Sequence, residues 1–308
     1  MAGIGIVLNP HSKKHKKDPD RMDRLAFIVG DKGSCKPTHD LADLQRVAEE
    51  FKTRDIEILG IGGGDGTIHV TLTAFIRVYG DKPLPKITFL RGGTLNTMAT
   101  ACGITGSPEK IISNLLYKYH EDEPFKTKEL DCMNINGEYG FIFGLGVVYR
   151  FMDAYYSKGN RSALGAGMTL GHAVGSAIIN GPFARKMFDR MEGEIWVDGK
   201  KWPFKNYSAI YAGAIDRLGL KFRVFHYSEE PRKFHAVGFS TPPRNILRHV
   251  PNMFLGKATT SEDLLEQPAE EMIIKLDQPQ AYTIDGDMLP AAKEIIVKTG
   301  PRLSVVVE

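Results

Sequence analysis

The stretch Ile61-Gly-Gly-Gly-Asp-Gly-Thr67 decides the fold of the first part of the chain. An apolar run over 56–61 precedes it and is typical of a buried strand, and a helical pattern over 68–79 follows it. Glycines let the backbone turn tightly and come close to a ligand. The N–H groups at the start of the following helix then form a natural phosphate site. We interpret this stretch as a loop that binds the phosphates of a nucleotide.

The same order of elements repeats on either side of this loop. Residues 4–8 and 86–90 read as strands, and a second glycine loop, Arg91-Gly-Gly-Thr94, precedes a helical stripe that ends at Gly103. Alternating strands and helices predict a parallel, doubly wound sheet, which binds ligands at the carboxyl ends of its strands. We therefore expect an α/β nucleotide-binding domain over 1–128 with both glycine loops at one edge.

Local signals add detail to this first domain. A helical face begins at Leu41, and Thr38 or Asp40 is its expected N-cap. Residues 9–12 read as a turn, and the lysines at 13, 14, 16 and 17 follow it in what we expect to be a loop. These lysines either form a solvated segment or contact phosphate or anionic lipid.

From about residue 129 the pattern changes to short strands joined by tight turns. It predicts a β-rich, sandwich-like second domain over 129–299, and the last strand, within 300–308, can return to the first domain. Helices are expected near 149–158 and 163–180, and a polar loop over 257–271. The expected strands are 131–135, 139–148, 194–197, 200–204, 207–211, 222–227, 234–239, 272–276, 281–284, 295–297 and 303–307.

Composition is that of an ordinary globular protein. The chain has 308 residues, of which 25% are charged, and its formal net charge is +3. Nucleic-acid binding needs a denser basic face, so we expect no nucleic-acid partner. The three cysteines are far apart, which fits a reduced cytoplasmic protein and forms neither a zinc motif nor a disulfide framework. The N-terminus lacks the pattern of a signal peptide.

The segment 162–184 carries no charge and has glycines at 167, 171 and 175. Such spacing occurs in membrane helices that dimerise. The segment also contains His172, Asn180 and a proline, so we do not expect it to span a membrane. We expect either a helix that packs closely on a sheet or one that lines an apolar pocket.

Several motifs together resemble the diacylglycerol kinase catalytic-domain family, which includes bacterial lipid kinases and the sphingosine and ceramide kinases. The resemblance covers nearly the whole chain. Its motifs are Asn9-Pro-His-Ser12, Gly63-Gly-Asp-Gly-Thr67, Gly93-Thr-Leu-Asn-Thr-Met-Ala99, Asn136-Gly-Glu-Tyr139, Arg161-Ser-Ala-Leu-Gly165 and Asp285-Gly-Asp287. The resemblance implies an ATP- and Mg²⁺-dependent kinase that phosphorylates a lipid hydroxyl, a diacylglycerol-like or sphingoid lipid as substrate, and a cytoplasmic protein peripheral to the inner membrane face. It leaves the oligomeric state open, a homodimer included.

The resemblance also implies residue roles. Asp287 falls at the position of a general base, and Asp65 at that of a metal-linked or proton-handling carboxylate, the pair facing a lipid hydroxyl in a cleft between the domains. The implied nucleotide-binding residues are Asn9, Ser12, Thr38, Gly63, Gly64, Asp65, Gly66, Thr67, Gly93, Thr94 and Asn96.

Three positions depart from the family's pattern. Lysines follow the first loop where glycine is usual, Val70 replaces a glutamate, and Asp287 replaces the usual glutamate base. Two alternatives therefore stay open, namely an NAD- or sugar-type kinase of the same superfold and a non-catalytic relative that binds nucleotide or lipid. Asp285-Gly286 alone is also the standard signal of a hairpin turn.

The segment 243–255 mixes basic with large apolar residues. Basic amphipathic segments bind membrane surfaces. We expect this segment either to touch the membrane, with Phe254 and Leu255 as contacts, or to form an ordinary packed helix.

Overall fold

The structure is a computed structural model that describes residues 3–18, 20–93, 96–157, 163–179, 181–217, 223–242, 245, 248–259 and 261–307. The chain divides into two compact units. Unit 1 comprises 1–130 together with 302–308, and unit 2 comprises 131–301. The boundaries expected from the sequence were 128/129 and 299/300. Each unit is described by itself.

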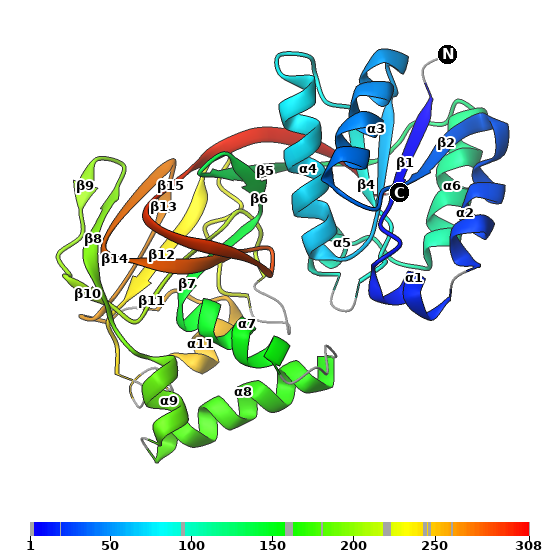
Figure 1. The fold of residues 1–308 in the computed structure, drawn as a ribbon. Coiled ribbons are helices and arrows are strands. Elements are labelled where there is room, and N and C mark those ends of the chain that lie inside the picture. Colours follow the sequence, from blue (N-terminus) through cyan, green and yellow to red (C-terminus); the bar gives the residue numbers. More distant parts are fainter. Residues whose placement is uncertain are drawn as a thin grey trace. The chain divides into compact units, whose positions relative to one another are not determined.

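Unit 1 is a parallel sheet with helices on both faces (Figure 1). Strand β1 lies between β2 and β3, and β4 continues the sheet beyond β3. The end of β15 completes the sheet, where Val305 pairs in parallel with Ile87 of β4. The strand bounds are Ile4–Leu8 for β1, Gly33–Pro37 for β2, Ile58–Gly62 for β3, Lys86–Phe89 for β4 and Asp287–Val306 for β15. This arrangement confirms the predicted parallel α/β fold class.

Strand β1 explains why helices cover both faces. Ile4, Ile6 and Leu8 pack into one core cluster with apolar residues of α2 and α6. Gly5 points to the opposite face, where its Cα hydrogens leave room for Phe51 of α3. Successive residues of a strand point to opposite faces of the sheet, so an apolar run of this kind is buried by helices on both faces. The helix bounds are Lys13–Lys17 (α1), Arg21–Val29 (α2), Leu41–Arg54 (α3), Asp65–Tyr79 (α4), Thr97–Ala101 (α5) and Pro108–His120 (α6).

Helix caps in unit 1 follow local rules. The Asp40 carboxylate caps α3 by accepting a hydrogen bond from Asp43 N at 2.8 Å, which confirms one of the two predicted caps. Ser107 caps α6, a helix that we did not predict although the Ser-Pro start signals it. The lysine segment was expected to be a loop and is the short helix α1, whose N-cap residue Ser12 makes no capping hydrogen bond through its side chain.

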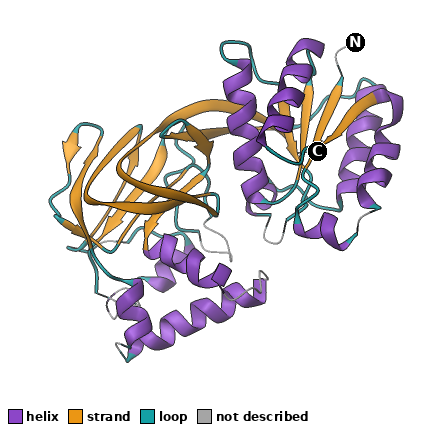
Figure 2. Cartoon of the chain, in the orientation of Figure 1, coloured by secondary structure: helices purple, strands orange, loops and turns teal. Residues whose placement is uncertain are grey.

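Unit 2 consists largely of strands, with a group of helices (Figure 2). It is built around the long strand β14, which pairs antiparallel with β15, β7 and β8. The sheet continues through β7, β11, β12 and β13. This β-rich unit confirms the second half of the predicted fold class. The strand bounds are Thr127–Ile135 (β5), Glu138–Gly140 (β6), Ile142–Gly146 (β7), Met191–Val197 (β8), Lys200–Lys201 (β9), Asn206–Tyr207 (β10), Ala209–Gly213 (β11), Phe234–Phe239 (β12), Leu264–Ala269 (β13) and Glu271–Ile284 (β14).

Two expectations for unit 2 were wrong. The supposed loop at 257–271 contains β13, which forms a strand within this largely polar segment because it pairs along its whole length with the buried β12. The supposed strand at 222–227 is irregular and turn-like over its described part, 223–227. At β13, pairing with a buried strand, rather than the polarity of the segment, decided the backbone conformation.

Helices α7 (Val147–Ser157), α8 (Ala163–Ile178), α9 (Pro182–Met187) and α11 (Val250–Leu255) complete unit 2. Helix α8 packs on α9 and α7 (Figure 1). Its glycines at 167, 171 and 175 face open space and so do not serve the expected close packing on a sheet, while the alternative, a helix that lines an apolar pocket, stays a prediction. Among the described residues, no helix is both long and apolar enough to cross a membrane.

Candidate active site

The residues expected to bind nucleotide follow the carboxyl ends of neighbouring parallel strands in unit 1. Asn9 follows β1 and Thr38 follows β2, while the two glycine loops follow β3 and β4. Backbone hydrogen bonds of 2.9 Å join Asn9 N to Gly62 O and Thr38 N to Leu8 O. The segments therefore lie side by side at one edge of the sheet, where doubly wound sheets bind their ligands.

The two glycine loops touch each other through their backbones. A Cβ atom on Gly93 would lie 2.5 Å from Gly64 Cα, and one on Gly92 would lie 2.9 Å from Gly63 Cα. A Cβ atom on Gly63 would overlap the side chain of Thr67. These glycines are therefore required by close approach, and the contact leaves an edge made of main-chain atoms rather than side chains.

Two asparagines fix the shape of this edge. The Asn9 amide donates to Thr67 Oγ1 at 2.9 Å, which ties the first loop to the start of α4. Asn96 accepts a hydrogen bond from Gly93 N at 2.9 Å and donates to Gly93 O at 3.1 Å. Its φ of 50° is left-handed, a conformation that asparagine tolerates better than most residues. Both asparagines thus hold loop backbones in place.

Asp65 is the first residue of α4 and joins the two glycine loops. Its carboxylate accepts hydrogen bonds from Thr97 N at 3.1 Å and Met98 N at 3.2 Å, the first amides of α5. Loss of solvent raises the pKa of the Asp65 carboxyl, and the two N–H donors act in the opposite direction. Each carboxylate oxygen has a second lone pair, so the same group can cap α5 and still accept a further ligand.

Ser12 and Thr38 are both buried at this edge. Ser12 Oγ has no hydrogen-bond partner among the described residues. A buried hydroxyl without a partner costs stability unless a ligand satisfies it, and a phosphate oxygen would do so. Gly66, in the first turn of α4, completes the described set. Thr94, also predicted to bind nucleotide, lies outside the described residues.

His15 is a further residue of this edge, to which the sequence analysis assigned no role. Its ring is 3% exposed, and Nδ1 lies 2.7 Å from Asn9 O. The imidazole therefore anchors the loop whose amide holds Thr67. A histidine amid lysines gave no sequence signal for this, because the contact depends on α1 folding back onto the loop.

The Asp285-Gly286-Asp287 motif lies in unit 2 and forms the tight turn between β14 and β15, where Ile284 pairs with Asp287. Asp285 and Gly286 have φ values of 50° and 89°, as a hairpin turn of this type requires. The buried Asp285 carboxylate accepts hydrogen bonds from Ile142 N at 2.8 Å and Phe141 N at 3.1 Å. Asp285 is therefore a structural residue that fixes the turn to the neighbouring strand.

Asp287, the predicted base, is the first residue of β15 and is half-buried. Helix α7 supports the turn beside it, since the Tyr156 hydroxyl donates to Gly286 O at 2.8 Å. Asp65 and Asp287 belong to different units. Because each unit is described by itself, the expected action of these two carboxylates on one lipid hydroxyl stays a prediction.

Comparison with known proteins agrees with this picture. Residues 4–123 match the family described as diacylglycerol kinase catalytic domain. A probable lipid kinase YegS from Salmonella arizonae is 30% identical over 140 residues, which cover 44% of this chain and 43% of that protein. Its counterpart from Salmonella heidelberg is 36% identical over 110 residues, which cover 35% of each. The matched segment thus spans less than half the length of these relatives.

The fold resembles solved structures over nearly the whole chain. A diacylglycerol kinase and a putative diacylglycerol kinase, both from Bacillus anthracis, superimpose with TM-scores of 0.68 and 0.70. Each alignment covers 99% of this chain and 97% of the other, at 12% and 14% sequence identity. These structures confirm the fold, and the match of residues 4–123 to the family model agrees with the resemblance that the motifs indicated.

Proposed function

We propose that this chain, whose residues 4–123 match the diacylglycerol kinase catalytic domain, is an ATP-dependent lipid kinase. It transfers the γ-phosphate of ATP to a hydroxyl of a diacylglycerol-like or sphingoid lipid. The observation that carries the proposal is the edge of unit 1 where two glycine loops meet backbone to backbone beside a buried, unpartnered serine hydroxyl.

Main-chain atoms at this edge suit the phosphates of ATP. Phosphoryl transfer depends mainly on positioning and charge neutralisation. The glycines at 63, 64 and 93 keep side chains away, so phosphate oxygens can reach backbone N–H groups at the start of α4. Ser12 Oγ and the Thr38 side chain add hydroxyl donors from the adjacent loops. Asn9 and Asn96 keep the loops rigid, which lowers the cost of binding.

Mg²⁺ fits this edge through Asp65. The carboxylate keeps lone pairs after its two backbone contacts, and Mg²⁺ usually takes one or two carboxylates plus substrate phosphates and water. When bound, Mg²⁺ would neutralise charge on the β- and γ-phosphates. Asp65 also orients the second glycine loop through the amides of α5. It would therefore act on the nucleotide in two ways, through Mg²⁺ and through the position of that loop.

The acceptor hydroxyl needs a base, and Asp287 is the proposed one. A carboxylate within hydrogen-bond reach of the lipid hydroxyl can take its proton as the bond to phosphorus forms. The hairpin turn and Tyr156 hold the backbone beside Asp287 in a fixed place. Aspartate in place of the family's glutamate shortens the reach by about 1 Å, a change that can alter rates about 100-fold.

The lipid is proposed to enter from the inner face of the membrane, with unit 2 as the peripheral contact. The helical part of unit 2 exposes large apolar side chains, namely Met168 (54%), Ile178 (60%), Ile179 (74%) and Leu255 (58%). Large exposed apolar groups are costly in water and favourable at a lipid surface. The side chain of Phe254 lies outside the described set.

Incubation with γ-labelled ATP, Mg²⁺ and a panel of diacylglycerol, sphingosine and ceramide tests the activity, with NAD and a sugar phosphate as parallel acceptors. Labelled lipid from at least one member is expected, and Asp65→Asn should lower the rate about 100-fold or more, because the amide cannot hold Mg²⁺ and both α5 amides. Labelled NADP or sugar bisphosphate instead of labelled lipid would favour the other kinase class. ATP binding without any turnover, unchanged in Asp65→Asn, would favour a non-catalytic relative.

The role of Asp287 has its own matched variants. Asp287→Asn should lower the rate about 100-fold or more because the amide cannot accept the proton. Asp287→Glu restores the side chain usual in the family and should retain substantial activity. Equal losses in both variants would mean that position 287 supports the turn and does not act as a base.

Vesicle flotation tests the membrane contact. The double variant Ile179→Ser/Leu255→Ser should weaken binding to anionic vesicles about tenfold or more, since each residue loses apolar area that lipid would cover. Phe27→Ser is the matched control, because Phe27 is 87% exposed but lies in unit 1. Equal binding by wild type and the double variant would remove these residues from the proposal.

A further inference from the structure

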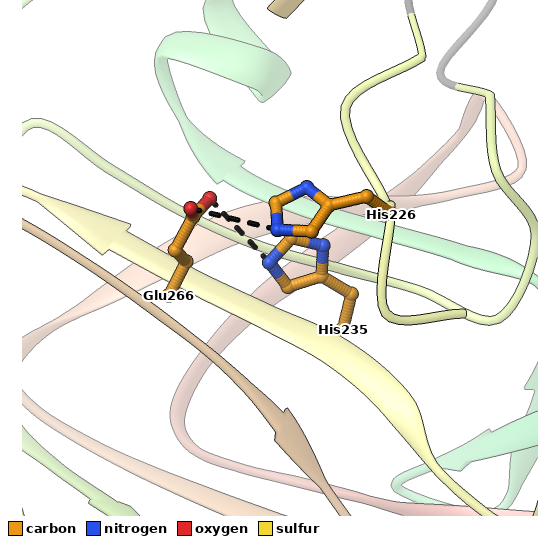
Figure 3. A group of neighbouring side chains, drawn as sticks. All are labelled: His226, His235 and Glu266. Carbon is orange, nitrogen blue, oxygen red and sulfur yellow. Dashed lines mark ion pairs between the residues drawn. The ribbon is translucent and has the colours of Figure 1, made fainter. Parts of the chain in front are cut away.

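His226, His235 and Glu266 lie together in unit 2, and the proposed kinase mechanism uses none of them (Figure 3). One potential ligand atom from each residue lies within 4.8 Å of the other two. The Nε2 atoms of the two histidines each lie 3.6 Å from an oxygen of the Glu266 carboxylate. The three side chains converge on one small volume.

The sheet register explains how two of the three residues meet. Val237 of β12 pairs with Glu266 of β13, and His235 lies two residues before Val237. Residues two apart on a strand share a face, so His235 and Glu266 point to the same side of the sheet. His226 approaches from the turn before β12, and Phe225 beside it packs over Gly213 of β11. The cluster thus joins a loop to two strands.

Three of the four ring nitrogens in this cluster have no hydrogen-bond partners among the described residues. Both ring nitrogens of His235 and Nε2 of His226 are buried and unpartnered, and His235 has no exposed surface. A separation of 3.6 Å is too long for a hydrogen bond. Burial of a polar group without a partner costs stability. Something placed between the rings and the carboxylate would remove this cost.

We propose that His226, His235 and Glu266 bind a zinc ion in unit 2. Two histidines and one carboxylate are a known zinc ligand set, and tetrahedral ligands at about 2.0–2.1 Å from the ion stand about 3.3 Å apart. The histidine–carboxylate separations of 3.6 Å are close to this value. The fourth position belongs to a water molecule, and the His226 side chain, 18% exposed, leaves a route for it.

The surroundings prepare the ligands for a cation. Glu266 Oε1 accepts a hydrogen bond from Thr259 N at 2.7 Å, which orients the carboxylate as outer-shell contacts do in metal sites. The Nε2 atoms of both histidines lie near the carboxylate, so all three side chains present a ligand atom to the same small volume. The ion would cross-link the loop that carries His226 to β12 and β13, which are already paired.

Metal content of the full chain, purified without a histidine tag, tests the site. After stripping with a chelator and addition of Zn²⁺, wild type should retain about one equivalent per chain by mass spectrometry. His226→Asn and Glu266→Gln should each weaken binding at least about 100-fold in competition with a coloured chelator. His226 is the least buried histidine of the pair, so its variant should fold. His120→Gln is the matched control, since this exposed histidine lies in unit 1.

Two further readouts separate zinc from a bridging water. Zn²⁺ should raise the melting temperature of wild type and of His120→Gln but not of His226→Asn, and Co²⁺ should give the visible spectrum of a tetrahedral site. Failure of wild type to retain zinc, with the same melting temperature in the presence and absence of Zn²⁺, would mean that water fills the cluster and would overturn the proposal. So would stoichiometric zinc that both ligand variants keep. Neither result depends on whether the chain phosphorylates a lipid.

Discussion

One group of glycines lies in the loops of unit 1 and another in α8 of unit 2, and the two groups differ in what surrounds them. In the loops of unit 1, a Cβ atom on Gly92 or Gly93 would meet backbone atoms of the other loop at 2.5–2.9 Å. In α8 of unit 2, Cβ atoms on Gly167, Gly171 and Gly175 would meet nothing within 4 Å. Both groups look alike in the sequence. The first brings two backbones into contact, whereas the second leaves one face of a helix without side chains.

Glycine is therefore required at the loop positions, whereas it is only tolerated in α8. The loop glycines are needed because no other residue fits the contact that forms the candidate phosphate site. The glycines of α8 lower helix stability and gain no contact within unit 2. Gly286 represents a third case, since its neighbours are 3.3 Å away and its φ of 89° is the stronger constraint. Alanine substitutions can show whether a position requires glycine because of a close contact, because of its backbone conformation, or for neither reason.

Gly93→Ala should have the largest effect. Its Cβ atom cannot be placed without shifting the backbone of Gly64, so we expect unit 1 to lose about 3 kcal/mol of stability and its ATP affinity. Both tryptophans, 196 and 202, lie in unit 2. Urea unfolding should therefore show an earlier far-UV dichroism transition and an unchanged tryptophan fluorescence transition. Wild-type ATP binding by this variant would show that the loops can separate without loss of the site.

Gly286→Ala should have an intermediate effect. An alanine held at positive φ costs about 1–2 kcal/mol, and here the tryptophan transition of unit 2 should move to lower urea concentration. Gly286→Asn is the control, because asparagine tolerates this region better and should cost less. If alanine and asparagine destabilise equally, the contacts with Met152 and Tyr156, rather than the dihedral angle, make glycine necessary.

Gly171→Ala should have the smallest effect and the opposite sign. Alanine in an exposed helix interior is favoured over glycine by about 1 kcal/mol, and nothing in the described part of the chain lies near the added methyl group. The melting temperature of unit 2, followed by tryptophan fluorescence, should rise by a few degrees. A fall would reveal that another surface covers this face of α8 in solution.

Local sequence signals predicted a good part of this protein. The glycine loop between β3 and α4, the N-cap at Asp40 and the strand over 234–239 all came from patterns within a few residues. What the sequence missed depends on contacts that form only in the folded chain. Strand β13, in a largely polar segment, forms by pairing with β12, and His15 acquires a role by contact with the loop at Asn9. Neither residue type nor spacing carries that information.

The sequence by itself determined the order of strands and glycine loops, and hence the parallel sheet and the edge at which a ligand binds, because periodicity and turn chemistry act locally. Tertiary structure alone decided how the acidic residues are used. Asp285 is committed to two backbone amides, Asp65 caps α5 while keeping lone pairs, and Glu266 faces two histidines. The same functional group, a carboxylate, is present in all three places. Its chemistry follows from which donors the fold brings within hydrogen-bond distance, and that is a property of contacts between distant segments.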